Sequence, residues 1–186
     1  MMQEDIHTLL VTTEFNPSAL SKNSWVIILH ASRMPPHIGI LINGHYSSLT
    51  IKGHELNVKA EALLKLISQK KTETLAIQLI KQPVFSLDHQ KEVFEHFIKQ
   101  FTKVEANGAT CLSPVKLFLQ EFYALPYLKH EMLFELTNRL TQNAYIYQTV
   151  GFNVDDKLKH GHFSLPQYTH SQLQQTIEQE TTPQIS

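Results

Sequence analysis

Residues 37–52 read HIGILINGHYSSLTIK, and this stretch decides the fold of the chain. At its centre is Asn43-Gly44, the dipeptide best suited to a two-residue type I′ turn, because both turn positions need a positive φ angle. Apolar and β-branched residues on both sides of the turn are typical of paired strands. The sequence therefore predicts a β-hairpin with strands over 37–42 and 46–52.

The turn also predicts which residues of the hairpin face each other. With Asn43-Gly44 as the loop, Ile42 pairs with His45, and the pairing continues outward until His37 faces Thr50. Side chains alternate between the two faces of a strand. One face is expected to point into the core and carries Ile38, Ile40, Ile42, Leu49 and Ile51. The other face carries His37, Gly39, Leu41, Tyr46, Ser48 and Thr50.

The second face has the composition of a functional site. Its imidazole, on His37, lies opposite Thr50 with a Cβ separation of roughly 4.5–5.5 Å, and Ser48 lies diagonal to it. We therefore expect Ser48 and Thr50 to act together with His37. Gly39 leaves room for a helix to approach, and Gly39 and Tyr46 are the expected substrate-binding residues.

The rest of the chain predicts an α+β domain, an antiparallel sheet led by the hairpin with helices packed against it. Apolar runs and helical spacing of apolar residues predict the other elements. Strands are expected over 25–29, 75–80 and 144–152, and helices over 58–70, from 88 to about 101, from near 111 to 122 and over 131–140. From Leu165 the sequence turns to Gln, Thr, Ser and Pro. We therefore expect a single domain over 1–164 and a flexible polar tail over 165–186.

Composition and charge exclude several classes of protein. Hydrophobic residues make up 42% of the chain and charged residues 18%, which is typical of a globular domain. The formal net charge of -1 gives no electrostatic argument for a nucleic-acid partner. No apolar run approaches the roughly 18 residues of a transmembrane helix, so no integral membrane segment is expected. Met1–His7 shows no secretory signal, which favours the cytoplasm, although export by another route stays open. The oligomeric state is also open.

Cys111 is the single cysteine, so no internal disulfide can form and a reducing compartment is expected. It lies on the apolar stripe of a predicted helix, four residues before Val115. The start of that helix has two readings: Thr110 caps it, or Ser113-Pro114 provides the cap and the first helical residue. Either start places the thiol near the positive end of the helix, which favours a thiolate.

Two segments carry a resemblance to a known group of enzymes. Residues 36–44 read PHIGILING, and residues 109–118 read ATCLSPVKLF. In this order they resemble the circularly permuted papain-like thiol enzymes, which include permuted NlpC-type amidases and relatives of lecithin retinol acyltransferase. The resemblance covers about residues 24–124 in element order. It implies a permuted papain-like α+β fold in which Cys111 attacks the carbonyl of an amide or ester and His37 acts as the base.

The chain departs from this family in the residue that orients the imidazole. The family usually places a His, Asn, Gln or acid on the second hairpin strand, whereas this sequence offers Ser48 or Thr50, and a hydroxyl stabilises an imidazolium less well than a carboxylate. The alternative is therefore an inert papain-like binding domain with a buried structural cysteine. A catalytic Cys111 should have a pKa below that of a free thiol.

Histidines near the C-terminal end form the one further cluster of note. His160, His162 and His170 have metal-ligand spacing, but they lie in a polar segment without a partnering cysteine, and we interpret them as a solvated loop. The sequence contains no Gly-rich phosphate loop and no zinc-hydrolase motif. We therefore expect neither a metal nor a cofactor. The substrate, whether peptide, cell-wall or lipid, is open.

Overall fold

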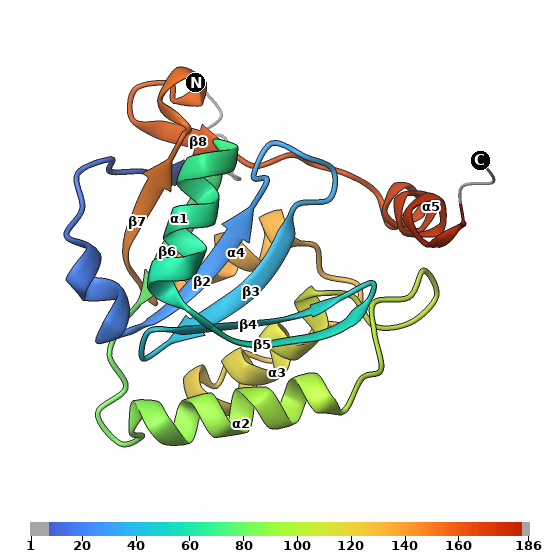
Figure 1. The fold of residues 1–186 in the computed structure, drawn as a ribbon, viewed down its shortest axis with the longest axis horizontal. Coiled ribbons are helices and arrows are strands. Elements are labelled where there is room, and N and C mark those ends of the chain that lie inside the picture. The colour runs from blue at the N-terminus through green and yellow to red at the C-terminus, as the bar shows by residue number, and fades with distance from the viewer. Residues whose placement is uncertain (1–7, 184–186) are drawn as a thin grey trace.

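The computed structural model describes residues 8–183 and confirms the α+β class. Its centre is an antiparallel sheet with strand order β5-β4-β3-β2-β6-β7 (Figure 1). These strands are β2 (Ser24–Leu29), β3 (His37–Ile42), β4 (His45–Thr50), β5 (Gly53–Lys59), β6 (Thr74–Leu79) and β7 (Ile146–Phe152). A separate antiparallel ribbon joins β1 (Thr8–Leu10) to β8 (His162–Ser164).

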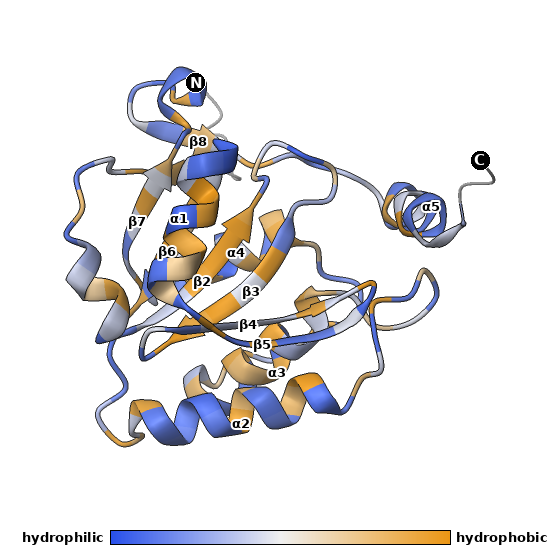
Figure 2. Ribbon diagram, viewed as in Figure 1, coloured by the Kyte–Doolittle hydropathy of each residue, from blue (hydrophilic) through white to orange (hydrophobic). Residues whose placement is uncertain are grey.

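Helices cover both faces of the sheet. The helices are α1 (Ala60–Lys70), α2 (Leu87–Lys99), α3 (Leu112–Tyr123), α4 (Leu133–Gln142) and α5 (His170–Thr181), with short 3-10 turns η1 (Pro17–Ser21) and η2 (Asp155–Lys157). One core cluster lies between the sheet and α1, and a larger one lies between the opposite face and α2, α3 and α4 and also includes Leu173 and Ile177 of α5. Figure 2 shows the apolar residues concentrated on the central strands, as expected for strands that are buried on both sides.

The predicted hairpin is confirmed at its turn. Asn43 and Gly44 have φ angles of 51° and 77°. The observed pairs are Ile42 with His45, Leu41 with Tyr46, and Ile40 with Ser47. Beyond these pairs the prediction is wrong, because the ladder between β3 and β4 stops there and His37 pairs with Leu29 of β2 instead of Thr50. The β4–β5 register also shifts between Tyr46 and Ser48, which bends β4 away at this point.

The hairpin face that we expected to be an open site is a second core face. Leu41 and Tyr46 have no solvent exposure and pack in the cluster under α1. Gly39 does not admit a helix. A Cβ atom at Gly39 would lie 2.6 Å from Cε2 of Tyr46, so the tyrosine ring occupies that space. The physical reason is that β3 lies inside the sheet, where both faces must be covered to bury its apolar residues.

The C-terminal segment also differs from the expected flexible polar tail. Residues 170–181 form α5, whose Leu173 and Ile177 are buried in the larger core cluster. These two residues are four positions apart and share one side of the helix, so a mostly polar sequence still presents an apolar stripe. Leu165 and Tyr168 anchor the preceding connection in the same cluster.

Other boundaries changed where local patterns were weak. Strand β5 was not predicted. The spacing of apolar residues predicted a helix from Val58, whereas in the structure β5 continues to Lys59 and the helix begins at Ala60. The lead-in over 1–23 contains β1 and η1, and the interpretation of Met1–His7 lies outside the described residues. Within residues 8–183, none of the helices combines the length and apolar character needed to cross a membrane.

Candidate functional site

Cys111 occupies the position immediately before the first residue of α3. The hydroxyl of Thr110 accepts a hydrogen bond from the Leu112 amide at 3.2 Å, and Ser113 Oγ accepts one from the Thr110 amide at 2.9 Å. The two hydroxyls thus satisfy amides that a helix start leaves unpaired. The helix begins at Leu112, between the two predicted starts, and the thiol lies at its positive end.

The thiol of Cys111 lies against the backbone of β3. Backbone amides along β3 point alternately toward β2 and toward β4. The Asn43 amide donates to the Asn23 carbonyl, so the odd-numbered amides point toward β2. The amide of Ile38, an even-numbered residue, therefore points toward β4. Because the β3–β4 ladder ends at Ile40, that amide is not used in it. It interacts with the Cys111 thiol instead. The end of the ladder therefore gives the thiol a backbone donor.

The thiol is neutral at rest despite these donors. Burial raises the pKa of Cys111 to about 11, and the hydrogen bonds from the backbone of Ile38, Cys111 and Leu112 offset this only in part. Negative charge on Glu180 acts in the same direction as burial. The expected thiol pKa below that of a free cysteine is therefore not found in this closed arrangement.

His37 is held at the start of β3 by one of the two expected hydroxyls. Its Nε2 lies 3.0 Å from Ser48 Oγ. Thr50 lines the same cavity as His37, but its hydroxyl donates to the Gly53 carbonyl and accepts from the Lys52 amide, so it stabilises the β4–β5 turn. Ser48 is thus beside the imidazole, and Thr50 is engaged elsewhere.

Burial lowers the pKa of His37 to about 4, and positive charge on His30 and Arg33 adds to the effect. Both candidate catalytic groups are consequently uncharged near neutral pH. Among the described residues no hydrogen bond is recorded for Nδ1 of His37.

His37 and Cys111 line one cavity. Gly39 was expected to leave room for the helix that begins near Cys111. That expectation is wrong, because Cys111 packs with the cluster that contains Ile38 and not over the face of Gly39. A cavity of about 660 Å³ nevertheless runs past the start of β3 and is lined by both His37 and Cys111. Within residues 8–183 the structure records no hydrogen bond between the two side chains. Gly39 and Tyr46 are the expected substrate-binding residues. They line neither this cavity nor the second cavity beside Cys111, which is described below.

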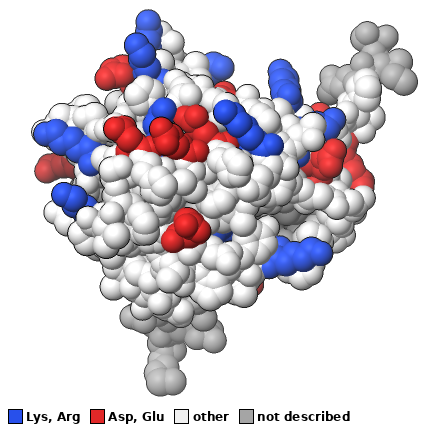
Figure 3. Space-filling view, turned by 90° about the horizontal axis from the view of Figure 1, so that it is seen from below, with Lys and Arg blue, Asp and Glu red and all other residues white. Residues whose placement is uncertain are grey.

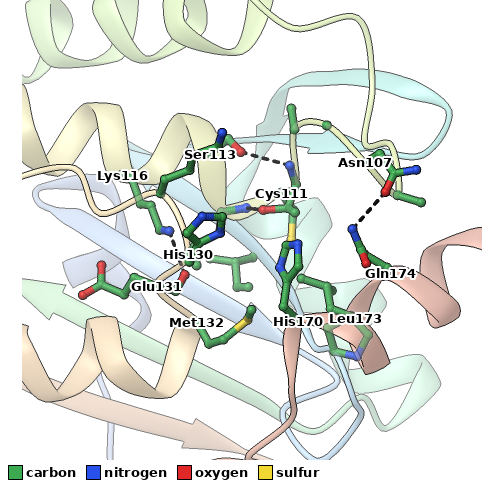
Figure 4. A pocket seen from close by; sticks show the side chains of 18 of the residues that line it. Asn107, Cys111, Ser113, Lys116, His130, Glu131, Met132, His170, Leu173 and Gln174 are labelled. Carbon is green, nitrogen blue, oxygen red and sulfur yellow. Dashed lines mark hydrogen bonds between the residues drawn. The ribbon is translucent and has the colours of Figure 1, made fainter.

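A second cavity, of about 480 Å³, borders Cys111 on the other side. Figure 4 shows His130 and His170 beside Cys111 in this pocket, and their ring centroids are 5.6 Å apart. The sequence interpretation missed both as site residues. His130 carried no local signal, and His170 was assigned to a solvated loop, whereas it is the first residue of α5. His160 and His162 lie at the β8 turn and do not line the pocket.

Lys116 fixes the loop that carries His130. Its Nζ donates to the carbonyls of Leu128 and Glu131, both at 2.7 Å, and lies 5.4 Å from the ring centre of Tyr127. Burial lowers the pKa of this ammonium group to about 8. These contacts indicate a structural role, because the donors of the lysine are directed to backbone carbonyls rather than into the cavity.

Neither the surface charge in Figure 3 nor a group of metal-ligand side chains among the described residues indicates a further binding partner. On the face shown in Figure 3, basic and acidic side chains are interspersed among wide uncharged areas. Over the described residues, no group of three or more His, Cys, Asp or Glu side chains could hold a metal ion. Comparisons with protein-family models, with curated proteins and with solved structures find no match to this chain.

Acidification is expected to weaken the fold through His37. The pKa of His37 is about 4 in the folded protein and 6.5 for an unperturbed histidine side chain, so the unfolded chain binds a proton first as the pH falls from 6.5 to 4. The free energy of unfolding should therefore decrease over this window by up to about 3 kcal/mol and be largest above pH 6.5. Urea unfolding of the wild type and of His37→Gln at intervals of pH measures this contribution. If the free energy of unfolding changed with pH equally in the two proteins, the contribution of His37 would be contradicted.

Proposed function

We propose that this protein is a cysteine-dependent hydrolase or acyltransferase that acts on an amide or ester bond, with a permuted papain-like arrangement of its α+β fold. Cys111 is the nucleophile, His37 is the general base, and Ser48 orients the imidazole. We place its action in the cytoplasm, where a single cysteine stays reduced.

One observation carries the proposal: the β3–β4 ladder ends where the N-terminal end of α3 approaches β3. This ending brings a thiol, backbone donors and an imidazole to one cavity. The amide of Ile38 favours negative charge on the sulfur. His37 precedes Ile38 in the chain and lines the cavity with Cys111. A nucleophile, a base and positive helix-terminal dipoles within one cavity are the elements that acyl transfer needs.

The reaction follows from these positions. Sγ of Cys111 attacks the carbonyl carbon as its proton passes to Nδ1 of His37, the nitrogen not engaged by Ser48. When the bond to the leaving group breaks, His37 returns that proton to the leaving amine or alcohol, and the acyl group stays on sulfur as a thioester. Water or a second alcohol or amine then attacks the thioester, with His37 again taking and returning the proton. The cysteine is regenerated.

One observation favours the alternative of an inert binding domain. The pKa values of about 11 for Cys111 and about 4 for His37 make the thiol and the imidazole both neutral at rest. Transfer of the proton from the thiol to the imidazole is therefore unfavourable while the two groups keep these pKa values. Papain-like activity depends on that transfer.

Acylation of Cys111 distinguishes the two functions. The protein is incubated with a panel of p-nitrophenyl esters and activated amides, and the site of acylation is read by peptide mass spectrometry. We expect a thioester on Cys111 and repeated turnover, both lost in Cys111→Ala. His37→Gln should lower the rate at least about 100-fold, the typical contribution of a general base.

His45→Gln is the matched control, since His45 belongs to the same hairpin and its Nδ1 contacts the Asn43 carbonyl near the turn. It should retain the wild-type rate. Acylation that is stoichiometric, without turnover and equal in wild type and His37→Gln would overturn the enzyme proposal and support the inert binding domain.

A further inference from the structure

Helix α5 borders both cavities beside Cys111. His170, Leu173 and Gln174 line the cavity of about 480 Å³. Ile177 and Glu180, further along the same helix, line the cavity of about 660 Å³. Cys111 belongs to the walls of both. A single helix therefore controls the space on two sides of the thiol.

The attachment of α5 is a narrow apolar stripe with a polar contact near each end. The stripe consists of Leu173 and Ile177, which are 9% and 3% exposed. Gln174 Nε2 donates to Asn107 Oδ1 at 2.9 Å. Arg33 pairs with Glu180 at 3.2 Å, but their side chains are 58% and 39% exposed, and exposed ion pairs contribute little. Separation of α5 thus breaks these contacts and the ring contact between His130 and His170.

The helix can also keep its own cap when it separates. Thr169 Oγ1 accepts from the Gln172 amide at 3.2 Å, and Gln172 Oε1 accepts from the Thr169 amide at 2.8 Å. This capping box lies entirely within the segment. Tyr168, immediately before it, is buried in the main core. A pivot at Thr169 would therefore keep the helix and its cap intact and would remove Leu173 and Ile177 from the larger core cluster. Figure 1 shows α5 at the side of the molecule at the end of a long connection.

We propose that α5 is a lid over Cys111, closed in this structure and displaced as a unit about Thr169 to admit a substrate. The role of this lid in admitting a substrate rests on the proposed function, but the displacement of α5 does not. In the closed position α5 lines both cavities beside Cys111, which is only partly buried, and so limits access to the thiol. Displacement hydrates the thiol and joins the access to the two cavities.

The test is the alkylation rate of Cys111 by iodoacetamide at pH 8 in the full chain. The double variant Leu173→Glu, Ile177→Glu places two charges in the apolar stripe and should displace α5. If the thiol pKa then returns from about 11 to its ordinary 9.0, the thiolate fraction rises about 100-fold. The lower basicity of that thiolate offsets roughly tenfold of the gain. We expect a net acceleration of about tenfold or more.

The matched control is Gln175→Glu, Gln179→Glu, which adds the same charge on the exposed side of α5 and should alkylate at the wild-type rate. Circular dichroism and the melting temperature verify that both double variants fold. In the wild type, the amides of α5 should exchange hydrogen at least about tenfold faster than those of α3, as expected for local opening. Equal alkylation in the folded stripe variant and the control, or equal exchange in α5 and α3, would overturn the lid. Neither readout requires catalytic activity, so a failed acylation experiment leaves this test intact.

Discussion

Replacing Phe118 with alanine is expected to lower the free energy of unfolding by about 3–5 kcal/mol. The ring is fully buried in the middle of α3 and lies 5.6 Å from Phe94 and 5.0 Å from Phe122 between ring centroids. Its removal leaves a cavity between α3, α2 and the sheet, which the surrounding aromatic rings cannot fill without leaving their own contacts. Urea unfolding followed by the fluorescence of Trp25, the single tryptophan, measures the loss.

This substitution also tests how firmly α3 holds Cys111. Val84→Ala is the control, because Val84 is 80% exposed and its truncation should change stability by less than about 0.5 kcal/mol. A loss below about 1.5 kcal/mol for Phe118→Ala would contradict close packing of this helix. The position of the thiol would then be less constrained than the structure indicates.

Replacing Gly39 with alanine is expected to cost about 1–3 kcal/mol, as overpacking of a core typically does. The new Cβ atom would lie 2.6 Å from both the Ser47 carbonyl oxygen and the Tyr46 ring. Tyr46 can rotate only at the expense of its fully buried position, and the Ser47 carbonyl belongs to the backbone of β4. The strands must therefore move apart, which should lengthen the contact between His37 and Ser48. Urea unfolding measures the stability, and the NMR signals of the His37 ring report the contact.

Gly108→Ala provides the comparison for this effect. Its added Cβ atom would lie 3.2 Å from Glu105 Oε2, the tip of a flexible side chain that can move away. The cost at Gly108 should be well below that at Gly39. Because the Ser47 carbonyl remains in place, Gly39→Ala should still lower stability when it is introduced into a Tyr46→Ala background, but by less than it does in the wild type. Equal losses at the two glycines would show that β3 and β4 separate without cost.

Local chemistry made part of the site predictable. The turn at Asn43-Gly44 determined the first pairs of the hairpin, and alternation along the strands then placed Ser48 near His37. The pairing of His37 with Thr50 was wrong, since a ladder can end wherever another element competes for its backbone. No local pattern reports that competition, which here involves the N-terminal end of α3.

The sequence by itself determined the α+β class, the hairpin turn and the placement of Cys111 at the start of a helix. These features depend on φ preferences and on apolar periods over neighbouring residues. Only the tertiary structure decided that both faces of β3 are buried, that Cys111 lies on the Ile38 side and that α5 lines the two cavities beside it. The reason is physical: such arrangements depend on which apolar surfaces stack across long separations in the chain, and many stackings satisfy the same local pattern.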